Sequence, residues 1–296
     1  MPIVYFTLLA TLAVFTAVHA ETTTKTFNVN AGGWLVVETD MGPIEVESAD
    51  VSTVSIEVEN AEKLELTFGQ EGNDVHIKGE KPEDAGFSLF RKFKPNWKNP
   101  PRFHIVVPQR YNVDLKTAGG GIAVDDLKGE VRVRTSGGSL KFGRIHGPIQ
   151  GDTSGGGIAI EEVEGETRVH TSGGSIEIVR AKGDVDAKTS GGNIRVEEIM
   201  GALNAHTSGG SIKAYISEQP YTPCTLKTSG GSVNIYLAEH IAANVDARTS
   251  GGNVKTDFPV VVQGELKKNH LKAQLNGGGP KLNLRTSGGN IRLHKM

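Results

Sequence analysis

The chain has 296 residues, which is enough for one large domain or two ordinary ones. Its formal net charge of -2 and its pI near 6.5 argue against a protein built mainly to coat nucleic acid. The single cysteine, Cys224, excludes an intramolecular disulfide, so packing and backbone hydrogen bonds must stabilise the fold.

The first element in the chain is an apolar segment. Residues 1–20 contain no Lys, Arg, Asp or Glu, and Val18 and Ala20 place small residues at the -3 and -1 positions of a cleavage site. This pattern predicts a secretory signal peptide, although the lack of a basic start leaves an uncleaved N-terminal anchor as the alternative. No later apolar stretch approaches the roughly 20 residues that span a bilayer. We therefore expect an exported protein of the periplasm, cell envelope or cell surface.

Residues 21–113 are predicted to form an irregular N-terminal β region that caps the rest of the fold. They lack a strict period, but residues 52–58 and 74–77 alternate as strands do, and residues 39–46 look like a degenerate copy of the repeat described below. Repeat folds need such atypical terminal units.

Aromatic and basic residues interleave in one loop of this region. Phe90, Arg91, Phe93 and Trp97 are its most conspicuous members. Such interleaving is typical of contact with a membrane surface or a glycan. The alternative is a capping loop whose aromatic side chains cover the end of the core.

A repeat dominates residues 114–256. The tetrapeptide Thr-Ser-Gly-Gly begins at Thr135, Thr153, Thr171, Thr189, Thr207, Thr228, Thr249 and Thr286, with a Thr-Ala-Gly-Gly variant at Thr117. The step is 18 residues from Thr117 to Thr207, followed by two steps of 21 and one of 37. A fixed period of this length predicts an all-β solenoid, in which each rung buries its apolar side against its neighbours.

Each repeat contains two alternating strands. In one of them Ile176 and Ile178 flank a polar residue, and in the next Val185 and Ala187 do the same. The alternation continues to Thr189, so we expect the threonines to point inward. We place the Gly-Gly pair at the turn between strands and expect positive φ there.

Charges at the ninth residue after each Thr indicate the size of a rung. Their order is Asp126, Arg144, Glu162, Arg180 and Glu198. Rungs of 18 residues would stack opposite charges at the strand spacing of about 4.8 Å, whereas rungs of 36 residues would stack like charges. The sequence therefore predicts a parallel β-helix with 18-residue rungs.

Residues 257–296 are predicted to form a C-terminal cap. The 37-residue gap before Thr286 has room for one decayed rung, with a strand at 271–275, and the last repeat is expected to end the fold. Exposed strand edges at both ends predict self-association through the solenoid ends.

These residues carry a family resemblance. The Thr-Ser-Gly-Gly-x-Ile-x-Val units, the opening at 27–37 and the strand at 105–108 resemble the bacterial putative-adhesin family of β-strand-repeat domains of unknown function. The family is distantly similar to the bactofilins. The resemblance implies a β-solenoid fold and an envelope location, and it transfers no catalytic residues.

The residue before each repeat Thr is the main binding candidate. Asp152 occupies one of these nine positions, and the other eight residues are basic or histidine: Lys116, Arg134, His170, Lys188, His206, Lys227, Arg248 and Arg285. Stacked at rung spacing, they would form a docking line for an anionic polysaccharide or another envelope component, rather than a specific nucleic-acid site. The alternative is a solvated face whose charges pair laterally.

No constellation of residues predicts an enzyme. His170 and His206 lie two rungs apart, about 9.6 Å by the strand spacing, which is too far to share a metal ion. We therefore expect no catalytic residues, no metal and no cofactor, and predict a non-enzymatic solenoid that binds an anionic surface polymer or glycan. The alternatives are a scaffold that assembles end to end, as bactofilins do, and a polysaccharide-acting β-helix enzyme.

Overall fold

The computed structural model describes residues 22–82, 99–263 and 267–296. The predicted signal peptide at 1–20 and the loop residues Phe90, Arg91, Phe93 and Trp97 lie outside the described residues.

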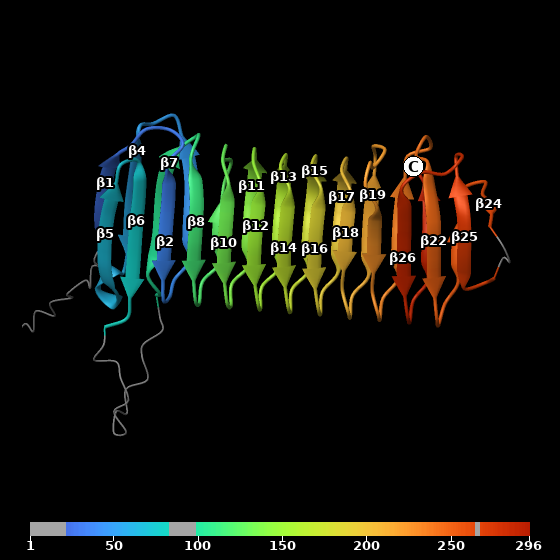
Figure 1. The fold of residues 1–296 in the computed structure, drawn as a ribbon. Helices are drawn as coiled ribbons and strands as arrows, with labels where there is room; N and C mark the ends of the chain where they lie inside the picture. The colour runs from blue at the N-terminus through green and yellow to red at the C-terminus, as the bar shows by residue number, and fades with distance from the viewer. Residues whose placement is uncertain (1–21, 83–98, 264–266) are drawn as a thin grey trace, which may run out of the picture.

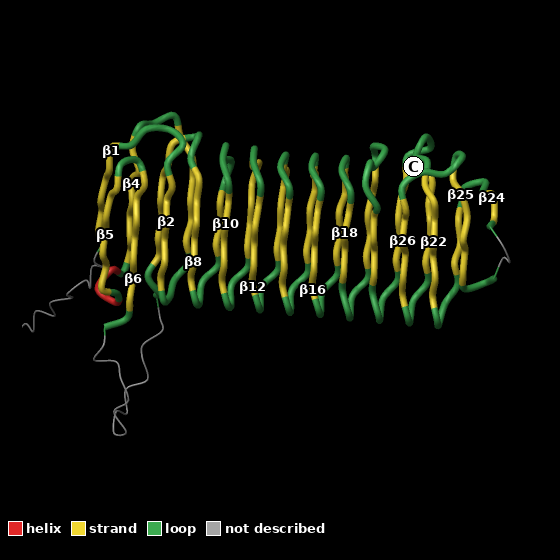
Figure 2. Tube along the Cα trace, viewed as in Figure 1, coloured by secondary structure: helices red, strands yellow, loops and turns green. Residues whose placement is uncertain are grey.

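Two facing sheets, called sheet A and sheet B below, run the length of the molecule (Figure 1). Among the described residues, sheet A has 13 strands and sheet B has 14. Strands account for nearly all the regular structure of the described segments, and the one short helix found in those segments lies at the N-terminal end (Figure 2). Consecutive repeats pair in parallel, which confirms the predicted β-solenoid.

The N-terminal elements are β1 (Thr23–Asn28), β2 (Trp34–Thr39), β3 (Ile44–Ala49), β4 (Thr53–Glu59), the 3-10 helix η1 (Ala61–Lys63), β5 (Glu65–Glu71), β6 (Asp74–Glu80) and β7 (Arg102–Pro108). The 18-residue repeats supply β8 (Asn112–Thr117), β9 (Ile122–Val124), β10 (Val131–Thr135), β11 (Leu140–Ile145), β12 (Ile149–Thr153), β13 (Ile158–Val163), β14 (Thr167–Thr171), β15 (Ile176–Ala181), β16 (Val185–Thr189), β17 (Ile194–Ile199), β18 (Leu203–His206) and β19 (Ile212–Ile216). The remaining strands are β20 (Cys224–Lys227), β21 (Val233–Leu237), β22 (Ala243–Thr249), β23 (Val254–Thr256), β24 (Val261–Val262), β25 (His270–Leu275), β26 (Lys281–Thr286) and β27 (Ile291–Lys295).

One rung consists of a strand in sheet B, the Thr-Ser-Gly-Gly turn and a strand in sheet A. In β14 and β16, Thr171 lies opposite Thr189, and in β15 and β17, Ile176 lies opposite Ile194. Both offsets are 18 residues, so the rung length is the one that the charge pattern predicted. The turns line up along the lower edge in Figure 1.

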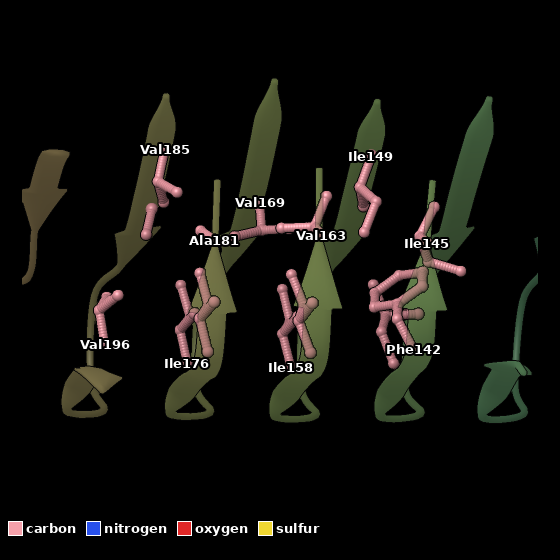
Figure 3. Packing of buried hydrophobic residues seen from close by; sticks show 14 of the residues in the cluster. Phe142, Ile145, Ile149, Ile158, Val163, Val169, Ile176, Ala181, Val185 and Val196 are labelled. Carbon is pink, nitrogen blue, oxygen red and sulfur yellow. The ribbon is translucent and has the colours of Figure 1, made fainter. Parts of the chain in front are cut away.

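The core is the space between the two sheets. Ile158 and Ile176 point into it from sheet A, and Val169 and Val185 from sheet B, each at most 3% exposed (Figure 3). Because side chains alternate along a strand, each strand buries one face and exposes the other. The outer faces of the two sheets are therefore the two long surfaces of the molecule.

The inward orientation of the repeat threonines is confirmed. Thr171 and Thr207 are fully buried, and every other repeat Thr is at most 5% exposed. The Thr189 hydroxyl donates to the carbonyl oxygen of Gly174 at 2.7 Å and accepts from the N–H of Gly192 at 3.3 Å. These bonds satisfy the buried hydroxyl, which would otherwise destabilise the core.

The expectation of positive φ at the Gly-Gly turns is wrong. Among the described residues, positive-φ glycines occur only outside the Thr-Ser-Gly-Gly turns, as at Gly42 and Gly277. The second glycine of each turn is required because stacked turns approach closely: a Cβ on Gly138 would lie 2.1 Å from the carbonyl oxygen of Gly120. The first glycine has more room, and a Cβ on Gly137 would meet nothing within 4 Å.

The alternating charge column is also confirmed, on the edge of sheet A. Arg180 lies opposite Glu162 and Glu198 in the register of the strands. Its guanidinium lies 2.7 Å from Glu198 and 3.5 Å from Glu162. Such exposed pairs contribute at most about 1 kcal/mol each, so they set the register more than they stabilise the fold.

At the N-terminal end, β2 and β3 form a rung built from the degenerate repeat. Thr39 lies opposite Thr117, and Ile44 lies opposite Ile122. Strands β6 and β7 pair in parallel on the outer side of this rung. Beyond them the pairing becomes antiparallel, with β5 on β6, and with β4 on β7 and β1 on β4.

The C-terminal end differs from the expectation. Strand β25, which contains residues 271–275, runs antiparallel to β22 and is therefore not a decayed parallel rung. The last repeat does not end the fold either, because β26 pairs with both β20 and β22, and β27 pairs with both β21 and β23. It thus lies between two rungs that precede it in sequence, and in Figure 1 the C mark stands above β26, well inside the end formed by β25 and β24.

Candidate binding faces of the solenoid

The predicted basic column lies on the outer face of sheet B. Strand register places its members in this spatial order: Lys116, Arg134, Asp152, His170, Lys188, His206, Lys227, Arg285 and Arg248. The last two are exchanged relative to the sequence because β26 lies between β20 and β22. The eight predicted residues are thus brought into one line, which we call the basic column.

Several members of the basic column pair with acids. The Lys116 ammonium lies 2.5 Å from Glu38 of the neighbouring strand. Arg134 lies 3.5 Å from Asp152 in the column itself, and Lys188 lies 2.7 Å from a carboxylate on its own strand, Asp186. At these positions the basic side chains pair with neighbouring acids, as the alternative interpretation of the sequence expected.

Asp246 joins three strands at the C-terminal end of the column. Its carboxylate accepts hydrogen bonds from Arg285 of β26 at 2.9 and 2.7 Å and lies 3.1 Å from the ring of His270 on β25. Arg248 in turn lies 3.2 Å from His270. The hydrogen bonds from Arg285 lower the pKa of Asp246 to about 2, so this carboxylate is ionised at neutral pH.

The middle of the column carries fewer acid contacts. His170, His206 and Lys227 are exposed, and none has a carboxylate within 4 Å among the described residues. From His170 to Lys227 the column crosses four successive rungs without an acidic member. This four-rung run is the part of the basic column best suited to meet an external anion.

Sheet A carries a second feature, which the sequence reasoning missed. The rings of Tyr215 and Tyr236 stack with centroids 4.3 Å apart, and the ring of His294 stacks on Tyr236 at 4.6 Å. All three residues are the eighth after a repeat Thr, so the tyrosine pair, which comes from successive repeats, was visible in the sequence. The place of His294 was not, because the 37-residue gap hid the pairing of β27 with β21.

The Toastrack DUF4097 family model matches residues 34–294, which span both faces. The chain belongs to this family. The match covers the rungs, the N-terminal strands from β2 onward and the inserted last repeat, and it bears out the resemblance carried by the repeats. Among curated proteins, none matches this Toastrack chain.

Solved structures with similar folds span nearly the whole Toastrack chain. A "putative cell adhesion protein" from Clostridium sporogenes is 13% identical and covers 93% of this chain and 100% of its own, with a TM-score of 0.24. A "putative adhesin" from Bacteroides fragilis is 12% identical, with 93% and 97% covered and a TM-score of 0.38. A "putative adhesin" from Parabacteroides distasonis is 11% identical, with 94% and 98% covered and a TM-score of 0.37. At these identities and TM-scores, the likeness carries no inference about a ligand.

Potential metal ligands and the single thiol were also compared with the requirements of a reactive centre, within the part of the Toastrack chain that the structure describes. Within residues 22–82, 99–263 and 267–296, no three His, Cys, Asp or Glu side chains lie where they could hold one metal ion. Burial raises the pKa of the Cys224 thiol, which keeps it protonated and a poor nucleophile. In the same ranges no helix has the length and apolarity to cross a membrane.

Proposed function

We propose that this Toastrack protein is an exported, non-enzymatic surface solenoid that binds an acidic polymer, such as an acidic polysaccharide, along the basic column of sheet B. The observation that carries the proposal is the four-rung run from His170 to Lys227, in which exposed cationic and imidazole side chains follow one another without an acid in the column. Export rests on the predicted signal peptide at residues 1–20.

The geometry of the run suits a linear ligand. Successive members are separated by the strand spacing of about 4.8 Å, so the four residues cover about 14 Å along the solenoid axis. A polymer with regularly spaced carboxylates could contact several members at once. Each contact on an exposed surface is weak, but linked contacts reinforce one another because they share one ligand.

The form of the surface supports a binding role over a catalytic one. Enzymes on β-helices need a groove in which acids and bases converge on one bond. The outer face of sheet B is instead a repeated array of side chains, in which Lys188 of the run pairs with Asp186 in the neighbouring column. Repetition along an axis favours recognition of a polymer over chemistry at a single point.

The experiment measures affinity for polygalacturonate in purified protein. The test variant is Lys188→Glu with Lys227→Glu, which reverses two charges in the run. The matched control is Lys25→Glu with Lys141→Glu, which changes the net charge equally but places the changes on strands β1 and β11 of sheet A. We expect the test variant to lose at least about tenfold in affinity and the control to bind as the unmodified protein does. Equal losses in both variants would show a net-charge effect and overturn the proposed docking line.

A further inference from the structure

Three neighbouring strands of sheet A carry an outward surface unlike the rest of that sheet. In the spatial order β19, β21 and β27, each strand presents two outward side chains. We call this set the aromatic strip; its members are Lys213, Tyr215, Asn234, Tyr236, Arg292 and His294.

The rings of the strip form one continuous stack. Tyr236 is covered on one face by Tyr215, with 13° between the planes, and on the other by His294, with 18° between the planes. The Lys213 ammonium lies 5.1 Å from the centroid of Tyr215 and 5.2 Å from that of Tyr236. All three rings remain half-buried, so they are still accessible from the solvent side.

The strip also carries positive charge that nearby acids do not neutralise. Lys213 and Arg292 have no carboxylate within 4 Å among the described residues, and neither does Lys255 on the adjoining strand β23. The three strands contribute no outward acid of their own. The nearest acidic contact of the strip is Asp257, which lies 3.1 Å from the ring of His294.

The regular part of sheet A shows a different arrangement. There the same two columns hold mostly acids and small residues, such as Glu161 and Gly143, and two cations. Arg195 lies 2.8 Å from Glu197, whereas Lys141 lies between Ala123 and Ala159 with no carboxylate within 4 Å among the described residues. The aromatic strip differs in placing two such unpaired cations beside a stack of rings. Structural stacking accounts for the rings alone, but it does not require unpaired cations beside them.

We propose that the aromatic strip is a second binding site, which takes a carboxylate-bearing saccharide. Lys213 and Arg292 would pair with the carboxylates, because charge-assisted hydrogen bonds are the strongest contacts such groups make. The Tyr215 and Tyr236 hydroxyls and the Asn234 amide would meet sugar hydroxyls. Stacked rings hold these groups in place, which reduces the entropy lost on binding.

The stacking at the centre of the strip disfavours a nucleic acid as the ligand. Single-stranded nucleic acids bind aromatic side chains through base stacking on an open ring face. Both faces of Tyr236 are already covered by Tyr215 and His294. What the strip presents is a row of polar groups and cations, which suits a saccharide chain lying along the solenoid axis.

This site is independent of the basic column, because sheets A and B present opposite outer faces of the solenoid. A protein with both sites would hold two acidic chains at once, one on each face. The strip deepens the proposed function by adding a second place for the same class of ligand. The test therefore needs a ligand too short to reach from one face to the other.

The probe is trigalacturonate, titrated by calorimetry into four purified proteins. The first is unmodified, and the second carries Tyr215→Phe, Tyr236→Phe and Arg292→Gln, which keep the ring stack but remove two hydroxyls and one cation. The third carries Lys188→Glu and Lys227→Glu on sheet B, and the fourth is the control Lys25→Glu with Lys141→Glu. Circular dichroism and the urea midpoint establish that each variant is folded.

We expect binding with two sites per chain in the unmodified protein and in the control. The aromatic-strip variant should lose one site, with at least about tenfold weaker affinity there. The sheet B variant should lose the other site and keep the strip. A strip variant that binds as the unmodified protein does, or an unmodified protein that binds no trigalacturonate, would overturn the second site. A different outcome separates the two proposals. If the strip variant loses its site while the sheet B variant binds as the unmodified protein does, the docking line is overturned and the aromatic strip stands.

Discussion

The hydroxyl of Thr189 donates a 2.7 Å hydrogen bond to the carbonyl oxygen of Gly174, which belongs to the preceding rung. The same bond recurs along the solenoid, for example from Thr171 to Gly156 and from Thr207 to Gly192. Side chains thus tie each turn to the one before it, in addition to the backbone ladder between the strands. This explains why threonine, with a hydroxyl and a β-branched shape, occupies this inward position in every Thr-Ser-Gly-Gly repeat.

Replacing Thr189 by Val should test this tie. Val has nearly the same shape, but it removes the hydroxyl and leaves the Gly174 carbonyl and the Gly192 N–H without this partner. We expect a loss of about 1–3 kcal/mol in the free energy of unfolding, measured from the urea midpoint. Thr189→Ser keeps the hydroxyl and should lose less, and Ser190→Ala on the exposed turn should change little. A Val variant as stable as the unmodified protein would show that the bond does not contribute.

The two glycines of one turn should respond differently to the same change. A Cβ on Gly138 would lie 2.1 Å from the carbonyl oxygen of Gly120, whereas a Cβ on Gly137 would meet nothing within 4 Å. We therefore expect Gly138→Ala to destabilise the protein by several kcal/mol or to prevent folding, and Gly137→Ala to be tolerated. Thermal unfolding of the two variants side by side gives the answer. Equal destabilisation of both would mean that backbone conformation, not close approach, requires the glycines.

These glycines illustrate what the sequence could and could not predict. The repeat, the inward threonines and the alternating charges all follow from local periodicity, and the structure confirms them. The requirement for glycine at position 138 does not follow from local periodicity. It arises because two turns that are 18 residues apart in sequence approach each other closely. Only the stacked arrangement distinguishes a crowded glycine from one with unusual φ.

Asp246 should make stability depend on acid pH. Its folded pKa is lowered to about 2, mainly by hydrogen bonds from Arg285. Because the folded value is below the ordinary value of an aspartate, its stabilising effect is present above about pH 4 and is lost as the pH falls toward 2. We expect Asp246→Asn to be less stable than the unmodified protein at pH 7, and the difference to shrink toward pH 2. Urea unfolding at both pH values measures this, and a difference that stays constant would contradict the assignment.

Removing the inserted repeat should loosen one part of the solenoid only. Deleting residues 281–296 removes β26 and β27, so β20 and β21 lose a parallel neighbour, and β22 and β23 do as well. Each rung of a solenoid contacts only its neighbours, so β12 to β17 should be unaffected. Hydrogen exchange should become faster in residues 224–256 and stay unchanged in residues 149–199. Faster exchange throughout would indicate that the inserted repeat supports the whole fold.

The insertion also marks where the sequence was misleading. The step from Thr207 to Thr228 and the step from Thr228 to Thr249 are both 21 residues long. The strands of the first step pair directly, whereas β26 lies between the strands of the second. The spacing alone therefore does not reveal the inserted repeat. Pairing between distant segments decides this arrangement. The same pairing brings His294 onto Tyr236 and completes the aromatic strip. The basic column, by contrast, was predictable because it follows the repeat.

The most direct test of the account is a titration of the purified protein with polygalacturonate at about 50 mM and about 200 mM salt. The account predicts binding at low salt that weakens at the higher concentration and is lost in Lys188→Glu with Lys227→Glu, but not in Lys25→Glu with Lys141→Glu. Absence of binding at low salt, or binding that ignores the Lys188 and Lys227 changes, would contradict the central claim that the basic column of this solenoid holds an acidic polymer.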